Sequence, residues 1–99
     1  MIPEEERAIR AKVRAHLVGQ GVPRDVVDEI VDLSFHAAQA AADAIWDVVG
    51  RASSEGIKVT AIGVAVGVAQ WRLEAIENGI KSYGSAMGHP VQSFTIGGE

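Results

Sequence analysis

The stretch VTAIGVAVGVAQW, Val59 to Trp71, runs for thirteen residues without a charged side chain in a chain of 99 residues. Read in twos, it alternates bulky with small residues, which is the period of a β-strand rich in β-branched side chains. A membrane span needs about twenty apolar residues, and this stretch is too short because Lys58 and Arg72 bound it. The stretch is therefore a strand or part of a buried helix, and that choice decides the fold class.

The residues that follow favour the helix. No helix breaker separates Ala69 from the segment QWRLEAIENGIK. A strand would need a partner strand, and the one candidate is Val91 to Ile96, whereas a two-stranded ribbon alone is marginal in water. We predict a helix from about residue 60 to residue 83, with the strand kept as the alternative. Its apolar seam, in alternating steps of four and three, consists of Ile62, Val66, Ala69, Leu73, Ile76, Ile80 and Tyr83.

Two more helices are expected before this one. Residues 3–18 begin with proline and three glutamates, which suit the first turn of a helix, and carry their basic residues later. The run from Gly19 to Pro23 ends the first helix, and helical periodicity then extends from about Arg24 to Gly50. The sequence thus predicts an all-α fold, with a short N-terminal helix and a long antiparallel helical hairpin. Residues 1–84 form one helical domain, and residues 85–99 a glycine-rich tail, in loop or extended conformation.

The hairpin has more apolar surface than one chain can cover. Over Val59 to Trp71 the third helix is apolar on every side, and a helix of that kind lies inside a larger assembly. We therefore predict a homo-oligomer, most simply a dimer in which two hairpins form a four-helix bundle. Two glycines one turn apart would let another backbone approach closely. The predicted oligomer interface consists of Ile62, Gly63, Val66, Gly67 and Val68.

The charges are divided between the first two helices. The formal net charge of −4 argues against a nucleic-acid partner, which demands a basic surface. Basic residues gather in the first helix, and acidic residues follow in the second, so the two segments are expected to attract each other within or between chains. The basic residues are Arg7, Arg10, Lys12 and Arg14, and the acidic ones are Asp25, Asp28, Glu29, Asp32, Asp43 and Asp47.

No pattern in the chain points to catalysis. Asp32 and His36, one helical turn apart, are the best metal candidates, but the Glu-x-x-His pairing of helical metal sites is missing. There is no Gly-x-Ser-x-Gly elbow, no phosphate-binding glycine loop before a helix and no cysteine. We predict no catalytic residue, no metal and no cofactor. The charged first residues are not those of a secretory signal, so a cytoplasmic location without membrane attachment is expected.

The favoured hypothesis is a non-enzymatic helical interaction protein that sequesters or occludes a protein partner. The architecture resembles small accessory proteins of phages and mobile elements that inhibit or regulate by binding, a likeness of shape that covers no motif. The tryptophans and the basic residues supply binding contacts, and the tail supplies a strand for a partner's sheet edge. The predicted partner-binding residues are Trp46, Trp71, Arg7, Arg10, Arg14, Val91, Phe94 and Ile96.

Two other classes of function remain open from the sequence. The first is a small-molecule or nucleotide-binding protein whose pocket forms between protomers. Its anion and ring contacts would come from Arg7, Arg10, Arg14, Arg72, Lys81 and Tyr83. The second is a helical metalloenzyme that uses Asp32 and His36, which predicts bound metal in the purified protein.

Overall fold

The computed structural model describes residues 3–58, 60–91 and 96, and for Ala61 and Ile62 only the backbone. Three helices follow one another: α1, Pro3–Gly19; α2, Arg24–Ser54; and α3, Ala61–Ala86. The described residues form no strand, so the all-α prediction is confirmed. The helical interpretation of the charge-free stretch is correct from Ala61 onward, whereas Val59 lies outside the described residues. In the part of the chain that the structure describes, no helix is long and apolar enough to cross a membrane.

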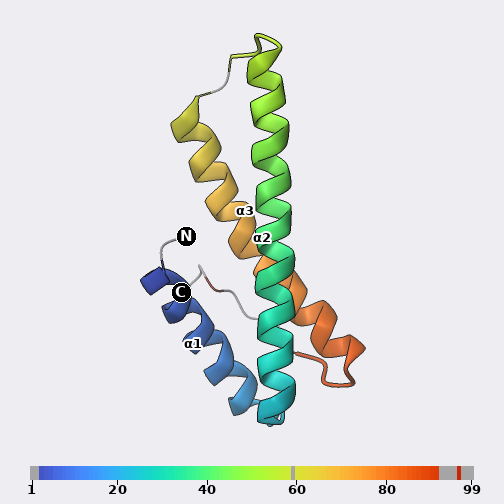
Figure 1. Ribbon diagram of the computed structural model, residues 1–99. Coiled ribbons are helices and arrows are strands. Elements are labelled where there is room, and N and C mark those ends of the chain that lie inside the picture. The colour runs from blue at the N-terminus through green and yellow to red at the C-terminus, as the bar shows by residue number, and fades with distance from the viewer. Residues whose placement is uncertain (1–2, 59, 92–95, 97–99) are drawn as a thin grey trace.

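The molecule is elongated, with extents of 51 × 25 × 21 Å. Helix α2 runs along its whole length, α3 crosses α2 at an angle, and α1 lies beside the lower half of α2 (Figure 1). The upper part of the described molecule, beyond the start of α1, therefore consists of α2 and α3 alone (Figure 1). We call residues 40–72 the arm, and its upper end, residues 51–58 with Thr60, the tip.

Each of the three helices is followed, two residues after its last residue, by a glycine with positive φ. At the end of α2, the N–H of Gly56 (φ 86°) donates to the carbonyl of Ser53, and the N–H of Ile57 donates to that of Ala52. This pair of hydrogen bonds satisfies the last helical carbonyls, and glycine takes the left-handed conformation at the lowest cost. Helices α1 and α3 end in the same way, at Gly21 and Gly88.

The glycine caps correct two predicted boundaries. The second helix was expected to end at Gly50, but α2 continues to Ser54 because Gly50 is still helical and the positive φ comes only at Gly56. The third helix was expected to end near Tyr83, and α3 continues to Ala86 because its glycine cap is Gly88. Residues 84–86, expected in or beside the tail, therefore belong to the helix.

The hydrophobic core occupies the lower half of the molecule. The α3 seam predicted from the sequence divides at about Leu73: Ile76 and Ile80 are fully buried, whereas Val66 is 63% exposed. The lower part of this seam is buried in the core that it shares with α2, α1 and Ile96, and no element of the described chain covers the upper part. The core cluster consists of Val13, Leu17, Val22, Val27, Ile30, Val31, Phe35, Ala38, Ile76, Ile80 and Ile96.

Helices α2 and α3 come closest at Ser34 and Gly79. A Cβ atom placed on Gly79 would lie 3.1 Å from the Cβ and 3.2 Å from the Cα of Ser34. Ser34 is fully buried, and its hydroxyl donates to the carbonyl of Ile30 at 2.7 Å. By contrast, a Cβ on Gly67 would meet nothing within 4 Å, and one on Gly63 would meet the hydroxyl of its own N-cap residue, Thr60. Close approach of another backbone to these two glycines thus stays a prediction about a second chain.

The helix crossing gives a first test of the fold. Gly79→Ala is expected to lower the free energy of unfolding by about 1–2 kcal/mol, because the methyl group pushes against the backbone of α2. The matched control, Gly50→Ala, meets open space within a helix and is expected to raise the stability by about 0.5–1 kcal/mol. Urea unfolding followed by circular dichroism measures both. Equal stabilisation by the two substitutions would contradict the close crossing.

Candidate functional site

Ion pairs hold α1 against α2. Arg10 Nη1 lies 2.8 Å from Asp32 Oδ1, and Arg14 pairs with Asp28. The guanidinium of Arg10 also lies 4.4 Å from the centroid of the Phe35 ring. The attraction predicted between the basic and acidic segments is therefore confirmed within one chain. Two of the basic residues predicted to bind a partner are thus already engaged with α2, whereas Arg7 is exposed and forms no ion pair among the described residues.

The tail contributes to the core through Ile96. Its side chain is 8% exposed, its N–H donates to Glu77 Oε1 at 2.6 Å, and its carbonyl accepts from Lys12 Nζ at 3.1 Å. Ile96 thus links α1 to α3, two helices that pack on α2 rather than on each other. Val91 is half-buried beside Gly84, and Phe94 lies outside the described residues. The sequence offered one signal for this role, the bulky apolar residues that interrupt a glycine-rich tail, Ile96 among them.

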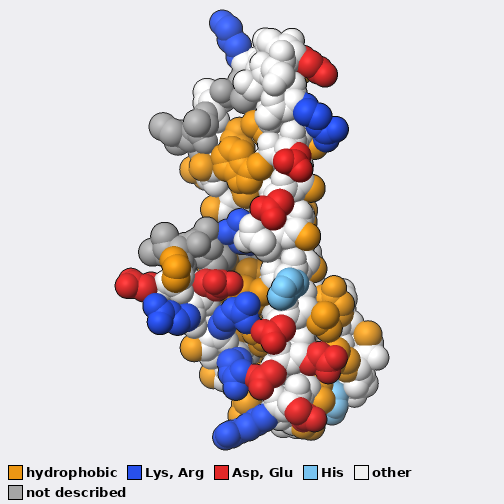
Figure 2. Space-filling view, viewed as in Figure 1, with side chains coloured by type: hydrophobic (Ala, Val, Ile, Leu, Met, Phe, Trp, Pro, Cys, Tyr) orange, Lys and Arg blue, Asp and Glu red, His pale blue; other side chains and the backbone are white. Residues whose placement is uncertain are grey.

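The arm carries a groove on the side where α1 lies further down. A hollow of about 180 Å³, which we call the arm groove, is lined by Trp46, Ala65, Val68, Ala69 and Arg72. Figure 2 shows hydrophobic side chains gathered here, between the upper parts of α2 and α3. Trp46 is 43% exposed, whereas Val68 is buried and leaves little surface for the interface to which it was assigned. The arm groove is the upper continuation of the core, and among the described residues no third element lies over it.

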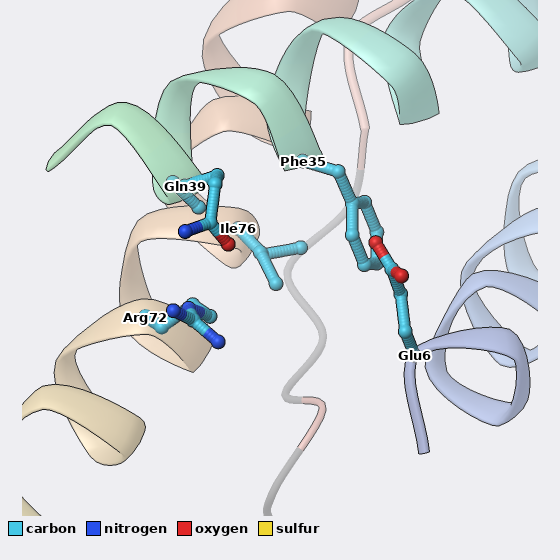
Figure 3. Close-up of a pocket in the computed structure, with 6 residues that line it drawn as sticks. Glu6, Phe35, Gln39, Arg72 and Ile76 are labelled. Carbon is cyan, nitrogen blue, oxygen red and sulfur yellow. The ribbon is translucent and has the colours of Figure 1, made fainter. Parts of the chain in front are cut away.

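Arg72 lies at the lower end of the arm groove. It also lines a hollow of about 40 Å³ between the three helices, together with Glu6, Phe35, Gln39 and Ile76 (Figure 3). Arg72 and Gln39 lie on one side of this hollow, and Glu6 and Phe35 lie on the other (Figure 3). The Nε atom of Arg72 is buried without a hydrogen-bond acceptor among the described residues. A buried donor in that state costs about 1–3 kcal/mol.

Two exposed apolar residues of the arm do not line the groove. Residues two apart on a helix of about 3.6 residues per turn point in nearly opposite directions. Because Trp46 lines the groove, Val48 points away from it on α2. Trp71 follows the groove-lining Val68 by three residues, so it lies on the flank of α3 beside the groove. Of the two tryptophans grouped from the sequence as partner-binding residues, Trp46 alone lines the groove.

The structure of a single chain places some of the residues expected for the two remaining functional classes, and a pocket between protomers stays a prediction. The carboxylate of Asp32 accepts from Arg10, and Nδ1 of His36 lies 3.1 Å from the backbone carbonyl of Asp32. Within the described ranges, no three His, Cys, Asp or Glu side chains are grouped so that they could hold a metal. Of the six residues expected around an anion, Arg10 and Arg72 line different hollows.

Comparison of the chain with protein-family models, with curated proteins and with solved structures finds no significant match.

Proposed function

We propose that the chain is a non-enzymatic helical interaction protein and that it assembles as a homo-oligomer, most simply a dimer, through the arm groove. One observation carries this proposal: the apolar seam of α3 is buried in the shared core in its lower half and lies open in its upper half. In the open half Val66 is 63% exposed, and Ala69 lines the arm groove together with Trp46. An apolar surface that continues a core is a surface where another chain packs.

The energetics of the arm support association. Each square ångström of apolar surface removed from water contributes about 25 cal/mol, and the half-exposed ring of Trp46 is a large part of the surface available. Tryptophan is enriched among the residues that dominate interface energies. A second helical surface placed over the arm groove would also complete the layered packing that helical bundles require.

Exposed apolar residues outside the groove supply a route to a partner protein. Val48 and Trp71 are exposed and do not line the groove, so a dimer formed through the groove presents two copies of each. Binding there would sequester a partner or occlude one of its surfaces, and it requires no chemistry from this chain. Arg7 on α1 is a further exposed contact predicted for the partner.

The oligomeric state is the direct test. Light scattering coupled to size-exclusion chromatography, at several micromolar concentrations, is expected to give twice the chain mass of 10.4 kDa. A single-chain mass at every concentration would overturn the proposal, because the open half of the seam would then have no cover.

A second candidate function rests on one observation, that Trp46 and Arg72 line the same hollow. A tryptophan ring and a guanidinium together suit a planar aromatic carboxylate. The hollow of about 180 Å³ is smaller than the roughly 300 Å³ at which ligand pockets begin, and this places the ligand hypothesis second. It predicts that indole-3-acetate perturbs the fluorescence of Trp46 and that Arg72→Ala abolishes the effect.

A further inference from the structure

We propose that Asp43 and Trp46 form a binding site for an arginine side chain. The arginine comes from a partner protein, on an amphipathic helix that packs in the arm groove. This inference rests on the arm groove as the interaction surface proposed above, and it adds the chemistry of the partner. The partner helix and a second copy of the chain compete for the same groove.

The chain already binds one arginine in this way. Arg10 Nη1 lies 2.8 Å from Asp32 Oδ1, and the guanidinium lies 4.4 Å from the centroid of the Phe35 ring. Asp32 and Phe35 are three residues apart on α2, so they are neighbours on its surface. The carboxylate accepts from the guanidinium, and the face of the ring attracts its positive charge. We call Asp32 and Phe35 the lower arginine site.

The same pair of residue types recurs further along α2. Asp43 and Trp46 repeat the spacing of Asp32 and Phe35, each eleven residues later in one continuous helix. Eleven residues are close to three turns, so the second pair faces within about 20° of the direction of the first, about 16 Å further along the helix. Tryptophan attracts a cation more strongly than phenylalanine does. We call Asp43 and Trp46 the upper arginine site.

The upper arginine site is open, whereas the lower one is filled. Phe35, beneath Arg10, is 6% exposed, but Trp46 is 43% exposed and lines the arm groove. Asp43 is exposed and accepts from Gln39 Nε2 at 2.8 Å. A carboxylate has about four acceptor positions, so room remains for a guanidinium. Among the residues that the structure describes, none forms an ion pair with Asp43 or stacks a cation on Trp46.

Helix α1 supplies the pattern of a partner that fits. Its Arg10 precedes Val13 by three residues, and Val13 is fully buried in the core. Residues three or four apart share one face of a helix, so one face carries both the arginine and an apolar side chain. A partner helix with this pattern places the apolar side chain in the arm groove, between Trp46 and Val68, while its arginine binds Asp43. Acidic side chains follow α2 on this side of the molecule, which favours a basic partner (Figure 2).

A peptide with the sequence of α1 is the probe for the upper arginine site. In the full chain with Trp71→Phe, Trp46 is the only tryptophan, so its fluorescence reports on the site. The peptide of residues 3–19 is expected to change this fluorescence with a saturable dependence on its concentration. A control peptide with its three arginines replaced by lysines keeps the charge but lacks the planar guanidinium, and it is expected to bind about tenfold more weakly. No saturable response, or equal binding of the two peptides, would overturn the arginine site.

Two substitutions that remove the same charge separate the site from general electrostatic attraction. Asp43→Asn is expected to raise the dissociation constant of the peptide by about tenfold, because a charge-assisted hydrogen bond to the guanidinium is lost. Asp47→Asn is the matched control, since Asp47 directly follows Trp46 and adjacent residues of a helix do not face each other. It is expected to change the dissociation constant by less than about twofold. Equal losses in the two variants would mean that the peptide responds only to the charge of α2, and the site would be refuted.

Light scattering of the same mixtures keeps this inference apart from the proposed dimer. Because the partner helix and the second copy compete, saturating peptide is expected to convert the dimer into single chains that carry the peptide. A single-chain mass without peptide, together with saturable binding, would overturn the dimer and leave the arginine site. A dimer whose mass and fluorescence do not respond to the peptide would overturn the arginine site and leave the dimer.

Discussion

Ile96→Ala is expected to lower the free energy of unfolding by about 2–4 kcal/mol, the range for truncating a buried isoleucine. The side chain is 8% exposed and belongs to the cluster that includes residues of all three helices. The hydrogen bonds of its backbone to Lys12 and Glu77 fix Ile96 between α1 and α3, so α1 has little freedom to close over the space left by the lost carbon atoms. A space that does not collapse adds to the loss of stability.

Ile57→Ala is the matched control, since it makes the same change in a side chain that is 55% exposed. It is expected to change the stability by no more than about 0.5–1 kcal/mol. Urea unfolding of both variants at one protein concentration, followed by circular dichroism, gives the comparison. Equal and small losses would mean that the tail is dispensable for the fold, and would favour the partner-binding strand predicted from the sequence.

The part of the fold that could be predicted is the part that local spacing determines. Apolar residues in steps of three and four identify α1, α2 and α3 because a helix repeats its face over that distance. The burial of Ile96 could not be found in this way, since its hydrogen-bond partners lie 84 and 19 residues away in the chain. Periodicity carries no information about contacts over such separations. The same limit misplaced the helix ends, because Gly50 and Gly56 differ in conformation and not in residue type.

The candidate site was predictable in composition and not in arrangement. The sequence indicated that the third helix is apolar on all sides over Val59 to Trp71, yet it did not say that α1 lies beside only the lower half of α2. That position follows from the pairing of Arg10 with Asp32 and of Arg14 with Asp28, where the sequence offered several acidic partners for each arginine. Helical spacing alone separates Trp46 from Val48, but only the placement of α3 identifies which of them faces the groove.

Trp46→Ala is expected to raise the dissociation constant of the dimer by about 30-fold or more, which corresponds to the loss of about 2 kcal/mol that defines an interface hot spot. The ring lines the arm groove and is 43% exposed in a single chain, so more than half of it is already supported by the arm while the rest is available to the partner. A ring held in this way contributes to binding without a large loss of side-chain entropy. Sedimentation equilibrium measures the dissociation constant, and circular dichroism checks that the three helices persist.

Trp71→Ala is the control for the role of the groove. Trp71 is 40% exposed, close to the exposure of Trp46, but it is not one of the residues that line the groove. Truncation of Trp71 is therefore expected to leave the dissociation constant within about threefold of the original value, a change well under 1 kcal/mol. If Trp71→Ala dissociated the dimer and Trp46→Ala did not, the copies would pair through the surface around Trp71. The arm groove would then stay open beside Arg72, and the planar-carboxylate hypothesis would become the better explanation of the hollow.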